Sequence, residues 1–365
     1  MSKPRIAIVS DWIIGGGAER VIESLHKLYP DAPIYTSYCS DTWRKKLNNR
    51  VVTGYLQNYP FNKLRKFAGP LRISWYKNLD LSSFDIVISC TGNGEAKNIK
   101  TSGTTKHICY CFTPVHYYWR HYQTYINNPG FGAFNWLARL GLKLLIKPLQ
   151  KIDYKAAQHP DIFVGISSHI QADIQKYYKR NSIVIAPPVD TKRFKKTNIN
   201  GKRQGFVTMG RLATIKRTEI IVDACTKLGL PLTVIGRGPA YKDLLQRAGP
   251  TVQILNNVSD QQMPSYLASA QAFLFASFED FGIAPVEAMA TGTPIIAYKA
   301  GGALDYVNSQ TGIFFNNQTS SSLQKAIKNF NGSQYDSAVI QSQADAFSTE
   351  HFQKNITSLV KKLSK

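Results

Sequence analysis

Residues 272–298 read AFLFASFEDFGIAPVEAMATGTPIIAY, in which apolar runs alternate with glycine, proline and charged residues. The apolar run Ala272–Ala276 predicts a buried strand, Ala284–Ala290 predicts a helix, and Pro294–Tyr298 predicts a second strand. Two neighbouring parallel strands need a crossover connection, which is usually a helix. The stretch therefore predicts one strand–helix–strand unit of a parallel sheet.

The same alternation continues on both sides of this stretch. Strand candidates occur at Arg5–Ser10, Phe84–Ser89, His107–Cys111, Asp161–Ser167, Ser182–Pro188, Gly205–Met209, Pro231–Ile235 and Gln253–Leu255. Helix candidates occur at Ala18–Leu28, His169–Tyr178, Arg217–Leu228, Met263–Ala268 and Ser320–Asn329. Alternating strands and helices in both halves predict the α/β class, with two doubly wound, Rossmann-like domains.

A polar and basic stretch, DTKRFKKTNINGKRQ at 190–204, separates the two halves. We therefore predict an N-terminal domain over 1–188, a linker over 189–204 and a C-terminal domain over 205–347. The last segment, 348–365, is expected to form a helix that packs back on the N-terminal domain. Two such domains are expected to face each other across a cleft, with ligands at the carboxyl ends of their strands.

The chain of 365 residues contains 45 Lys+Arg and 23 Asp+Glu, which gives a formal net charge of +22. This charge favours nucleic acid, an anionic membrane surface or a phosphorylated substrate as partner, and the alternative is a solvated basic face. No zinc-finger, RNA-recognition or basic-zipper signature occurs, so nucleic acid is not expected. No apolar run reaches the roughly 18 residues that span a membrane. The five scattered cysteines are expected to be reduced thiols in the cytoplasm, without a metal site.

Two regions concentrate the basic charge. Residues 42–79 hold nine basic side chains and no acidic one: Arg44, Lys45, Lys46, Arg50, Lys63, Arg65, Lys66, Arg72 and Lys77. In residues 131–151, apolar side chains recur at helical spacing (Phe131, Phe134, Trp136, Leu137, Leu140, Leu144 and Leu145) beside a basic stripe of Arg139, Lys143, Lys147 and Lys151. Such a helix either lies in a lipid headgroup layer or packs on its own domain. The first alternative predicts a protein bound peripherally to the inner face of the membrane.

Glycine and basic residues follow the first predicted strand of each domain. Gly15–Gly17 would let backbone N–H groups approach an anion at a helix N-terminus, although the spacing is not that of the dinucleotide fingerprint. Arg211 and Lys216 lie five residues apart on a strand-to-helix turn, where a guanidinium and an ammonium group suit a diphosphate. The alternatives are an ordinary glycine-rich loop and solvated basic residues.

Two carboxylates, Glu279 in a loop and Glu287 on the following helix, come after the strand Ala272–Ala276. Carboxylates accept hydrogen bonds from pairs of hydroxyl groups, so the two residues suit two sets of sugar hydroxyls. Gly282 between them would let backbone amides close on a ligand. The alternative is that both carboxylates only cap the helix or face solvent.

The order of these motifs resembles the retaining GT-B glycosyltransferases, and among them the large nucleotide-sugar hexosyltransferase family four. The resemblance rests on GGGAER at 15–20, APPVD at 186–190, GRL followed by KR at 210–217, and Glu279-x7-Glu287 with PVEAMATGTPIIAYKAGGA at 285–303. The segments CYCFTPVHYYW at 109–119 and FEDFGIAPVEAMATGTP at 278–294 are similar to bacterial mannosyltransferases of polysaccharide and glycolipid assembly. The motifs match in order over nearly the whole chain.

The resemblance implies a donor-binding set in which each part of the donor has its own residues. This set is Gly16, Gly17, Arg211, Lys216, Gly236, Arg237, Val258, Phe281, Gly282, Ile283 and Glu287. The two early glycines would face the distal phosphate or the transferred sugar, and Arg211 and Lys216 would neutralise the diphosphate. Glu287 would bind the ribose hydroxyls, and residues 236–258 would surround the base. No metal or cofactor is implied, and no Asp-x-Asp motif occurs, so basic residues and backbone dipoles must supply the positive charge.

Glu279 and His116 are the residues for which the resemblance implies a catalytic role. Glu279 would hold the hydroxyls of the transferred sugar. Relatives usually have histidine at the place of Phe112 and arginine at the place of His116, so the family's active-site histidine is not where the pattern puts it. His116 either takes over the acceptor contact or is a structural histidine. A retaining transfer of this type is thought to need no protein nucleophile.

The function expected from the resemblance is a retaining, metal-independent transfer of a hexose, with mannose favoured. The donor would be a nucleoside-diphosphate sugar such as GDP-mannose, and the acceptor a lipid-linked glycan or a glycolipid. The alternative is a non-enzymatic polyanion-binding protein that keeps the two-domain shell. The intact basic and glutamate pairs favour the enzyme, whereas Phe112 slightly favours the alternative.

Overall fold

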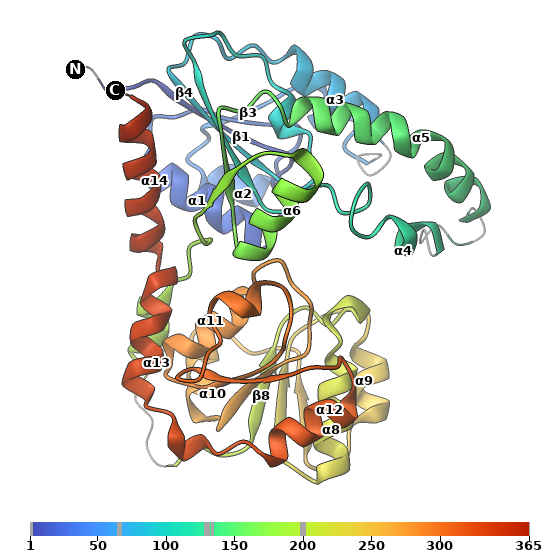
Figure 1. The fold of residues 1–365 in the computed structure, drawn as a ribbon, viewed down its shortest axis with the longest axis vertical. Coiled ribbons are helices and arrows are strands. Elements are labelled where there is room, and N and C mark those ends of the chain that lie inside the picture. Colours follow the sequence, from blue (N-terminus) through green and yellow to red (C-terminus); the bar gives the residue numbers. More distant parts are fainter. Residues whose placement is uncertain (1–2, 64–67, 128–131, 133–134, 198–201, 365) are drawn as a thin grey trace. The chain divides into compact units, whose positions relative to one another are not determined.

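The structure is a computed structural model that describes residues 3–63, 68–127, 132, 135–197 and 202–364. The chain divides into two compact units, residues 1–186 with 353–365 and residues 187–352. Each unit is built on one sheet whose strands all run parallel, with helices beside it (Figure 1). The predicted α/β class with two doubly wound domains is therefore confirmed.

The first unit has a seven-stranded sheet in the order β3-β2-β1-β4-β5-β6-β7. Its strands are β1 (Ile6–Ser10), β2 (Ile34–Thr36), β3 (Val51–Thr53), β4 (Ile86–Thr91), β5 (Lys106–Cys111), β6 (Ile162–Gly165) and β7 (Ser182–Val184). Its helices are α1 (Gly17–Leu28), α2 (Asp41–Lys46), α3 (Gly69–Asn78), α4 (Tyr122–Asn127), α5 (Asn135–Ala156) and α6 (Ser168–Tyr178). β1 and β4 are buried along their whole length, because apolar and small side chains occupy both of their faces. The strand order reverses between these two strands, and such a switch point is where doubly wound sheets bind ligands.

The second unit has a six-stranded sheet in the order β10-β9-β8-β11-β12-β13. Its strands are β8 (Phe206–Met209), β9 (Leu232–Ile235), β10 (Val252–Leu255), β11 (Ala272–Phe275), β12 (Ile295–Tyr298) and β13 (Gly312–Phe315). Its helices are α7 (Thr191–Lys195), α8 (Thr218–Leu228), α9 (Tyr241–Arg247), α10 (Met263–Ser269), α11 (Ile283–Ala290), α12 (Ser320–Lys328) and α13 (Ser337–Ala344). The switch point lies between β8 and β11.

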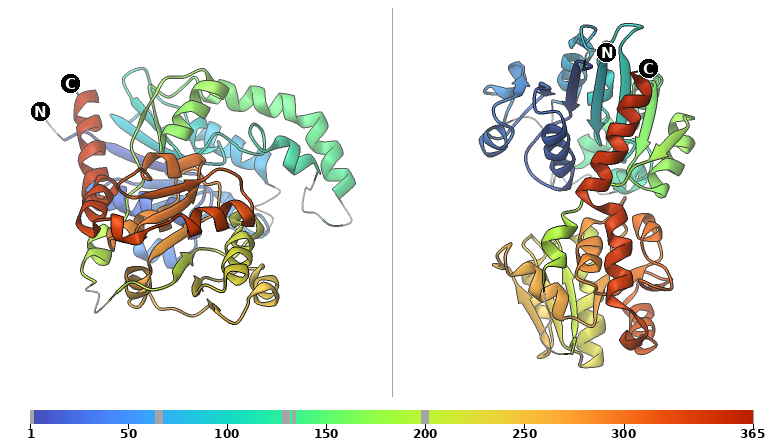
Figure 2. Two further views of the ribbon diagram at one scale, coloured as in Figure 1. Left: turned by 60° about the horizontal axis from the view of Figure 1, so that its bottom comes forward. Right: turned by 90° about the vertical axis from the view of Figure 1, so that its left-hand side faces the viewer.

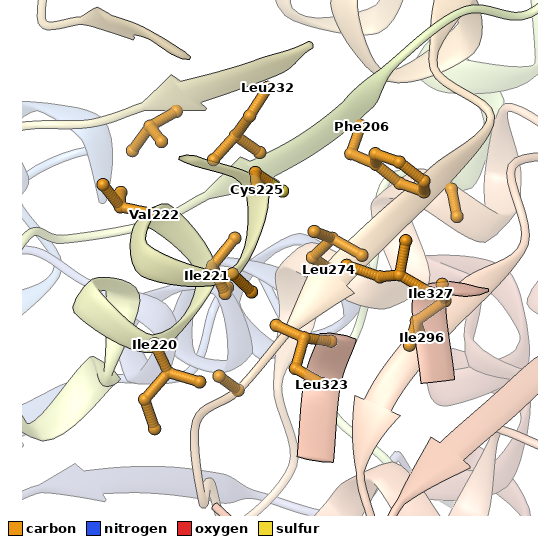
Figure 3. Close-up of a cluster of buried hydrophobic side chains, with 14 of the residues drawn as sticks. Phe206, Ile220, Ile221, Val222, Cys225, Leu232, Leu274, Ile296, Leu323 and Ile327 are labelled. Atoms are coloured by element: carbon orange, nitrogen blue, oxygen red, sulfur yellow. The ribbon is translucent and has the colours of Figure 1, made fainter. Parts of the chain in front are cut away.

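The core of the second unit fixes the strands that carry the site. Side chains of α8 and α12 meet those of β8, β9, β11 and β12 in one buried cluster, which Figure 3 shows. Ile221 and Leu323 come from the two helices, and Leu274 and Ile296 come from two neighbouring strands. This packing fixes where the carboxyl ends of β8 and β11 lie within the unit.

Part of the predicted linker is structured and belongs to the second unit. The Asp190 carboxylate accepts a hydrogen bond from the Arg193 backbone N–H at 3.3 Å and caps α7. Phe194 of this helix is 1% exposed, so it is part of a core. The polar composition of the segment concealed this one anchoring side chain. Residues 198–201 of the predicted linker lie outside the described residues.

The chain ends in α14 (Thr349–Leu363), which Figure 2 shows from two sides. Residues 353–365 group with the first unit, and the Gln353 side-chain amide donates a hydrogen bond to the Ser24 carbonyl at 3.5 Å. Among the described residues, we find no helix whose length and apolarity would suffice to cross a membrane.

Candidate functional site

The second unit has a depression at the carboxyl ends of β8, β9 and β11. Arg211 and Lys216 reach it from the segment between β8 and α8, and Ser277 and Glu279 reach it from the loop after β11. Gly210 contributes backbone to its lining. The structure therefore brings the predicted diphosphate-binding pair and the predicted catalytic glutamate into one place.

The centre of this depression is an ion pair between Lys216 and Glu279. The Lys216 Nζ lies 2.7 Å from the Glu279 Oε1, and the two side chains are 28% and 24% exposed. The Ser277 hydroxyl donates to the same carboxylate oxygen at 3.1 Å. Ser277 was not predicted from the sequence, although its place two residues before the glutamate was a usable signal. The contacts hold the carboxylate in one position while leaving it open to solvent.

Arg211 supplies the second positive charge of the depression. Its side chain is exposed and makes no ion pair or hydrogen bond with any residue that the structure describes. Its guanidinium fork is consequently available to two oxygens of an anion, which is the geometry that phosphate groups favour.

Hydrogen bonds from Gly302 and Tyr306 hold the loop that carries Glu279 in place. Gly282 has φ +89°, and a Cβ there would lie 2.7 Å from the Tyr306 hydroxyl. That hydroxyl donates to the Phe281 carbonyl at 3.0 Å, and the Gly302 N–H donates to the Glu279 carbonyl at 2.8 Å. Burial raises the pKa of Tyr306, which keeps the hydroxyl as a donor. The loop is therefore rigidly placed at the start of α11.

The loop's other predicted donor-binding residues have different environments. The Phe281 side chain is 3% exposed and packs against Tyr306 and Phe347, so only its backbone remains for a ligand. Ile283 is the first residue of α11, where the backbone N–H groups lack helical partners. Glu287 lies one turn further, is 5% exposed, and is not part of the lining of the depression.

Gly236, Arg237 and Val258 lie on the loops that follow β9 and β10. A Cβ on Gly236 would lie 1.9 Å from the Gly210 carbonyl oxygen, so the two loops touch through their backbones. The Arg237 guanidinium donates to the Asn256 carbonyl at 2.5 Å and to the Asn257 Oδ1 at 2.8 Å. Val258 is half-buried. These contacts order the loops beside the depression.

In the first unit, the predicted glycines lie at the start of α1. Gly16 and Gly17 are exposed, and Gly15 and Gly16 have φ +139° and +151°. The Glu19 carboxylate accepts hydrogen bonds from the N–H groups of Ile14 and Gly15 at 2.9 and 2.8 Å. Those two amides are therefore used by the protein itself, and only the following glycines present an exposed backbone.

A buried carboxylate that the sequence analysis missed organises the loop after β4. Asp11 is 5% exposed and accepts hydrogen bonds from the N–H groups of Gly92, Asn93 and Ala96 at 2.8, 2.7 and 2.7 Å. An aspartate directly after the first strand, at the switch point of the sheet, was the signal that could have found it.

Two buried ion pairs flank this loop. The Arg72 guanidinium lies 2.8 Å from Glu95, and Lys97 pairs with Asp153. Burial and the nearby Asp11 carboxylate raise the pKa of Glu95 to about 8, although Arg72 opposes the shift. Neither pair faces open solvent, so both stabilise the unit's interior rather than a solvated surface.

His116 is half-buried among aromatic rings. Its ring centroid lies 5.7 Å from that of Tyr117 and 6.2 Å from that of His121. Its carbonyl accepts a hydrogen bond from the His121 N–H at 2.7 Å. Phe112, at the place of the family histidine, packs edge-on against Tyr110. These contacts leave the acceptor role of His116 a prediction.

The interpretation of residues 42–79 as a free basic surface is wrong for several of the nine side chains. Arg72 is buried in its ion pair, and the Arg44 guanidinium donates to the Val51 carbonyl at 3.0 Å. Lys46 pairs with Glu23, and Arg50 pairs with Asp31. Counting charge along the sequence could not reveal partners from other segments. Arg65 and Lys66 lie outside the described residues.

No group of three or more His, Cys, Asp and Glu side chains that could hold a metal ion occurs in the part of the chain that the structure describes. All five cysteines are free and buried.

Residues 189–344 match the family described as Glycosyl transferases group 1. The chain is 24% identical over 217 residues to the D-rhamnosyltransferase WbpZ of Pseudomonas aeruginosa, which covers 53% of this chain and 55% of that protein. It is 30% identical over 131 residues to a GDP-mannose-dependent alpha-mannosyltransferase of Corynebacterium glutamicum, which covers 33% of this chain and 32% of that protein. The matches thus span about half or less of these two relatives.

A longer match and the solved structures extend the similarity beyond the second unit. The chain is 28% identical over 354 residues to the GDP-Man:Man(3)GlcNAc(2)-PP-Dol alpha-1,2-mannosyltransferase of Xenopus tropicalis, covering 79% of this chain and 71% of that protein. The fold is similar to Anabaena HepE in complex with UDP, with a TM-score of 0.72 at 18% identity over 98% of this chain and 100% of that one. Sucrose-phosphate synthase from Thermosynechococcus elongatus gives a TM-score of 0.72 at 15% identity over 99% of both chains.

Proposed function

This chain has the GT-B fold with a glycosyl transferases group 1 domain at residues 189–344, and from that premise we propose that it transfers a sugar from a nucleoside-diphosphate donor. The observation that carries the proposal is the gathering of Arg211, Lys216 and Glu279 in one depression. Two cationic groups suit a diphosphate, and a carboxylate held by Ser277 suits sugar hydroxyls. The three residues therefore match the two chemically distinct halves of such a donor.

In the proposed reaction, the bond between the sugar C1 and the diphosphate oxygen breaks, and a bond from C1 to the acceptor oxygen forms on the same face. The acceptor hydroxyl loses its proton to the departing diphosphate, so no protein nucleophile is needed. Arg211 and Lys216 stabilise the negative charge that develops on the leaving group. Glu279 holds the sugar while positive charge develops on its ring.

The other donor contacts are carried over from the resemblance. Glu287 on α11 would take the ribose hydroxyls, and the N–H groups at the start of that helix would face the sugar. The base would lie beside Gly236, Arg237 and Val258. Because two basic side chains supply positive charge, the reaction proceeds without a divalent metal or another cofactor.

We favour GDP-mannose as the donor, because two of the similar proteins are a GDP-mannose-dependent mannosyltransferase and a mannosyltransferase that acts on a dolichol-linked glycan. A relative with a dolichol-linked acceptor also supports a lipid-linked glycan or glycolipid as the acceptor here. Such an acceptor would place the enzyme at the inner face of a membrane, bound peripherally.

The alternative of a non-enzymatic polyanion-binding protein is not favoured. A polyanion would need the basic residues of the depression but would be repelled by the Glu279 carboxylate beside Lys216. A donor with a sugar attached to its diphosphate uses both charges.

A transfer assay tests this proposal. The protein is incubated with labelled GDP-mannose, UDP-glucose or ADP-glucose and a lipid extract, and lipid-bound label is measured. We expect label from one donor, with the configuration at C1 retained, and a loss of product in Glu279→Gln. Donor binding without any transfer to lipid, water or an added saccharide would reject the enzyme in favour of a binding protein.

A further inference from the structure

α5 exposes large apolar side chains on its N-terminal half. Trp136 is 64% exposed and Leu144 is 68% exposed, and Leu137, Leu140 and Leu145 are about half exposed. In both Figure 1 and Figure 2 this end of the helix extends beyond the sheet of its own unit. A surface helix of a globular protein normally packs such residues against its own core. An exposed apolar face of this size is typical of a surface that binds a partner or a membrane.

The other end of α5 is anchored in the first unit. Ile146 is buried beside Val115 and Tyr118, and Leu149 packs against the same cluster. Asp153, the helix's only acidic residue, is 4% exposed and accepts a hydrogen bond from the Trp119 indole N–H at 2.8 Å. The apolar face therefore projects from a fixed base and is not the frayed end of a loose helix.

A row of lysines runs beside the exposed leucines. Lys143, Lys147, Lys151 and Lys155 recur every four residues, are exposed, and have no acidic partner among the residues that the structure describes. Residues three apart are neighbours on a helix surface, so Leu140 adjoins Lys143 and Leu144 adjoins Lys147. Apolar side chains are thus interleaved with unpaired positive charge on one outward face.

Arg139, the first basic residue of the predicted stripe, has a different task. Its guanidinium donates to the Ile126 and Asn127 carbonyls at 3.0 and 2.8 Å and ties α5 to the end of α4. Phe131 and Phe134, the other apolar residues of that prediction, lie outside the described residues. The face that remains consists of Trp136, Leu137, Leu140, Leu144 and Leu145 with the four lysines, and we name it the α5 face.

We propose that the α5 face docks on an anionic lipid surface. Trp136 and the leucines enter the boundary between headgroups and acyl chains, while the lysine ammonium groups meet lipid phosphates. The inference deepens the proposed function, on which it rests for the reason why a lipid surface lies near the acceptor. Of the two basic regions of the sequence, it assigns the membrane contact to this helix and not to residues 42–79, where several charges are already paired.

The charge selects lipid over a second copy of the chain. Two copies meeting through this face would bring their lysine rows together, and like charges in contact oppose association. An anionic bilayer offers opposite charge and an apolar layer at once, which is the combination that the face presents.

The test measures flotation of the full chain with phosphatidylglycerol-containing vesicles and with phosphatidylcholine vesicles, at low and at high salt. One variant changes charge, Lys143→Gln with Lys147→Gln and Lys151→Gln. A second changes the apolar side chains, Leu140→Gln with Leu144→Gln. The matched control removes three exposed lysines of the second unit, Lys242→Gln with Lys325→Gln and Lys328→Gln.

We expect the wild type and the control to float with anionic vesicles and to be released by salt. The lysine variant should bind at least roughly tenfold more weakly, since each basic residue contributes on the order of 1 kcal/mol near an anionic surface. The leucine variant should also bind at least roughly tenfold more weakly, because it buries less apolar surface in the lipid. Tryptophan emission of the wild type should shift to the blue on binding, and Trp136→Phe should lose this shift.

Equal flotation of the wild type and both α5 variants would overturn the proposal, as would no flotation of the wild type. A wild-type dimer in gel filtration that the leucine variant converts to a monomer would assign the face to a second copy instead. Nucleotide-sugar binding is measured without vesicles on the same proteins. A wild type that binds donor but does not float would contradict the docking alone, and a wild type that floats but binds no donor would contradict the proposed function alone.

Discussion

At the scale of single residues, the main feature of the site is the ion pair between Lys216 and Glu279. In the free protein each of these side chains satisfies the other, while the Arg211 side chain makes no ion pair or hydrogen bond with the described residues. A bound diphosphate would therefore meet one free cation and one cation shared with a carboxylate. Because an ion pair that water reaches contributes little to stability, rearranging this partly exposed pair on binding costs little.

Substitutions of the two glutamates of the motif should have different effects on turnover and on nucleotide affinity. Glu279→Gln should lower turnover on the order of a hundredfold while nucleotide affinity changes little, because its proposed partner is the transferred sugar. Glu287→Ala should weaken nucleoside-diphosphate binding by about tenfold or more, because lost hydrogen bonds to a charged group cost roughly 1.5–3 kcal/mol. Steady-state kinetics and calorimetric titration separate the two effects.

Glu350→Gln is the matched control, since Glu350 also pairs with a lysine, Lys192, but outside the site. It should leave both quantities unchanged. If the Glu287→Ala protein bound a bare nucleoside diphosphate as tightly as the wild type, the ribose role would be wrong.

For single residues, the sequence predicted correctly that side chains lie together where each of them follows a strand of the same sheet. Arg211, Lys216 and Glu279 obey that rule, because parallel strands end at one edge. Asp11 was missed because the N–H groups that it binds lie about 80 residues further along the chain. Ser277 was missed because its contact with Glu279 depends on the direction in which its hydroxyl points. Arg72 was misinterpreted, because only the folded chain brings Glu95 to it.

The loops after β8 and β9 depend on a contact that only glycine allows, which is an effect at the scale of elements. A Cβ at position 236 would lie 1.9 Å from the Gly210 carbonyl oxygen. Gly236→Ala should therefore lower the free energy of unfolding by roughly 1–3 kcal/mol and weaken donor binding, because the loop must move. Gly103→Ala, where nothing lies within 4 Å of the new methyl group, is the control. Thermal melts with and without nucleotide measure both, and two equally stable variants would refute the contact.

β5 holds a histidine whose burial makes the first unit sensitive to acid. Burial lowers the pKa of His107 from 6.5 to about 3, and its Nε2 lies 2.8 Å from the Ser89 hydroxyl. The unfolded chain thus binds a proton that the folded chain rejects. This stabilising difference is present above pH 6.5 and is lost as the pH falls toward 3.

At pH 5 the loss from this residue should approach about 2 kcal/mol, because one pH unit corresponds to about 1.4 kcal/mol. Urea unfolding at pH 7.5 and pH 5 should show a smaller difference for His107→Gln than for the wild type. The exposed His351→Gln should behave like the wild type. Identical pH differences in all three proteins would mean that His107 does not titrate as the burial requires.

Helix and strand types were predictable where the apolar pattern was long, and boundaries were not. β11, α11 and β12 fall within one or two residues of their predictions from the opening stretch. α5 ends at Ala156 rather than at Lys151, because the buried Asp153 and Ala156 continue its inward face beyond the predicted segment. α7 was missed, since one buried phenylalanine in a basic segment gives no period to detect.

At the scale of the whole molecule, the resemblance to GT-B glycosyltransferases, which the motifs indicated, is confirmed by the matching family and the similar folds. The fold could be predicted because strand–helix alternation has few solutions in parallel sheets. The donor base, the sugar and the acceptor could not, because they depend on loop contacts that no periodicity encodes.

Activity should survive a chelator. In the proposed reaction the Arg211 and Lys216 side chains supply the positive charge that a divalent ion would otherwise provide, and the sequence lacks an Asp-x-Asp motif. Transfer rates measured with EDTA should therefore match those without it, to within about twofold. A rate that depends strictly on added Mg²⁺ or Mn²⁺ would contradict the metal-free reaction.

The most direct measurement is a calorimetric titration of GDP, UDP and ADP into the wild type and into an Arg211→Met, Lys216→Met double variant. We predict that one nucleotide binds the wild type, and that the double variant binds it about a hundredfold more weakly, because two charge-assisted contacts to the diphosphate are lost. A control with two other exposed lysines of the second unit changed, Lys227→Met with Lys328→Met, should bind like the wild type. Equal affinity of the wild type and the Arg211, Lys216 variant would show that the donor diphosphate does not bind at the carboxyl ends of β8 and β11.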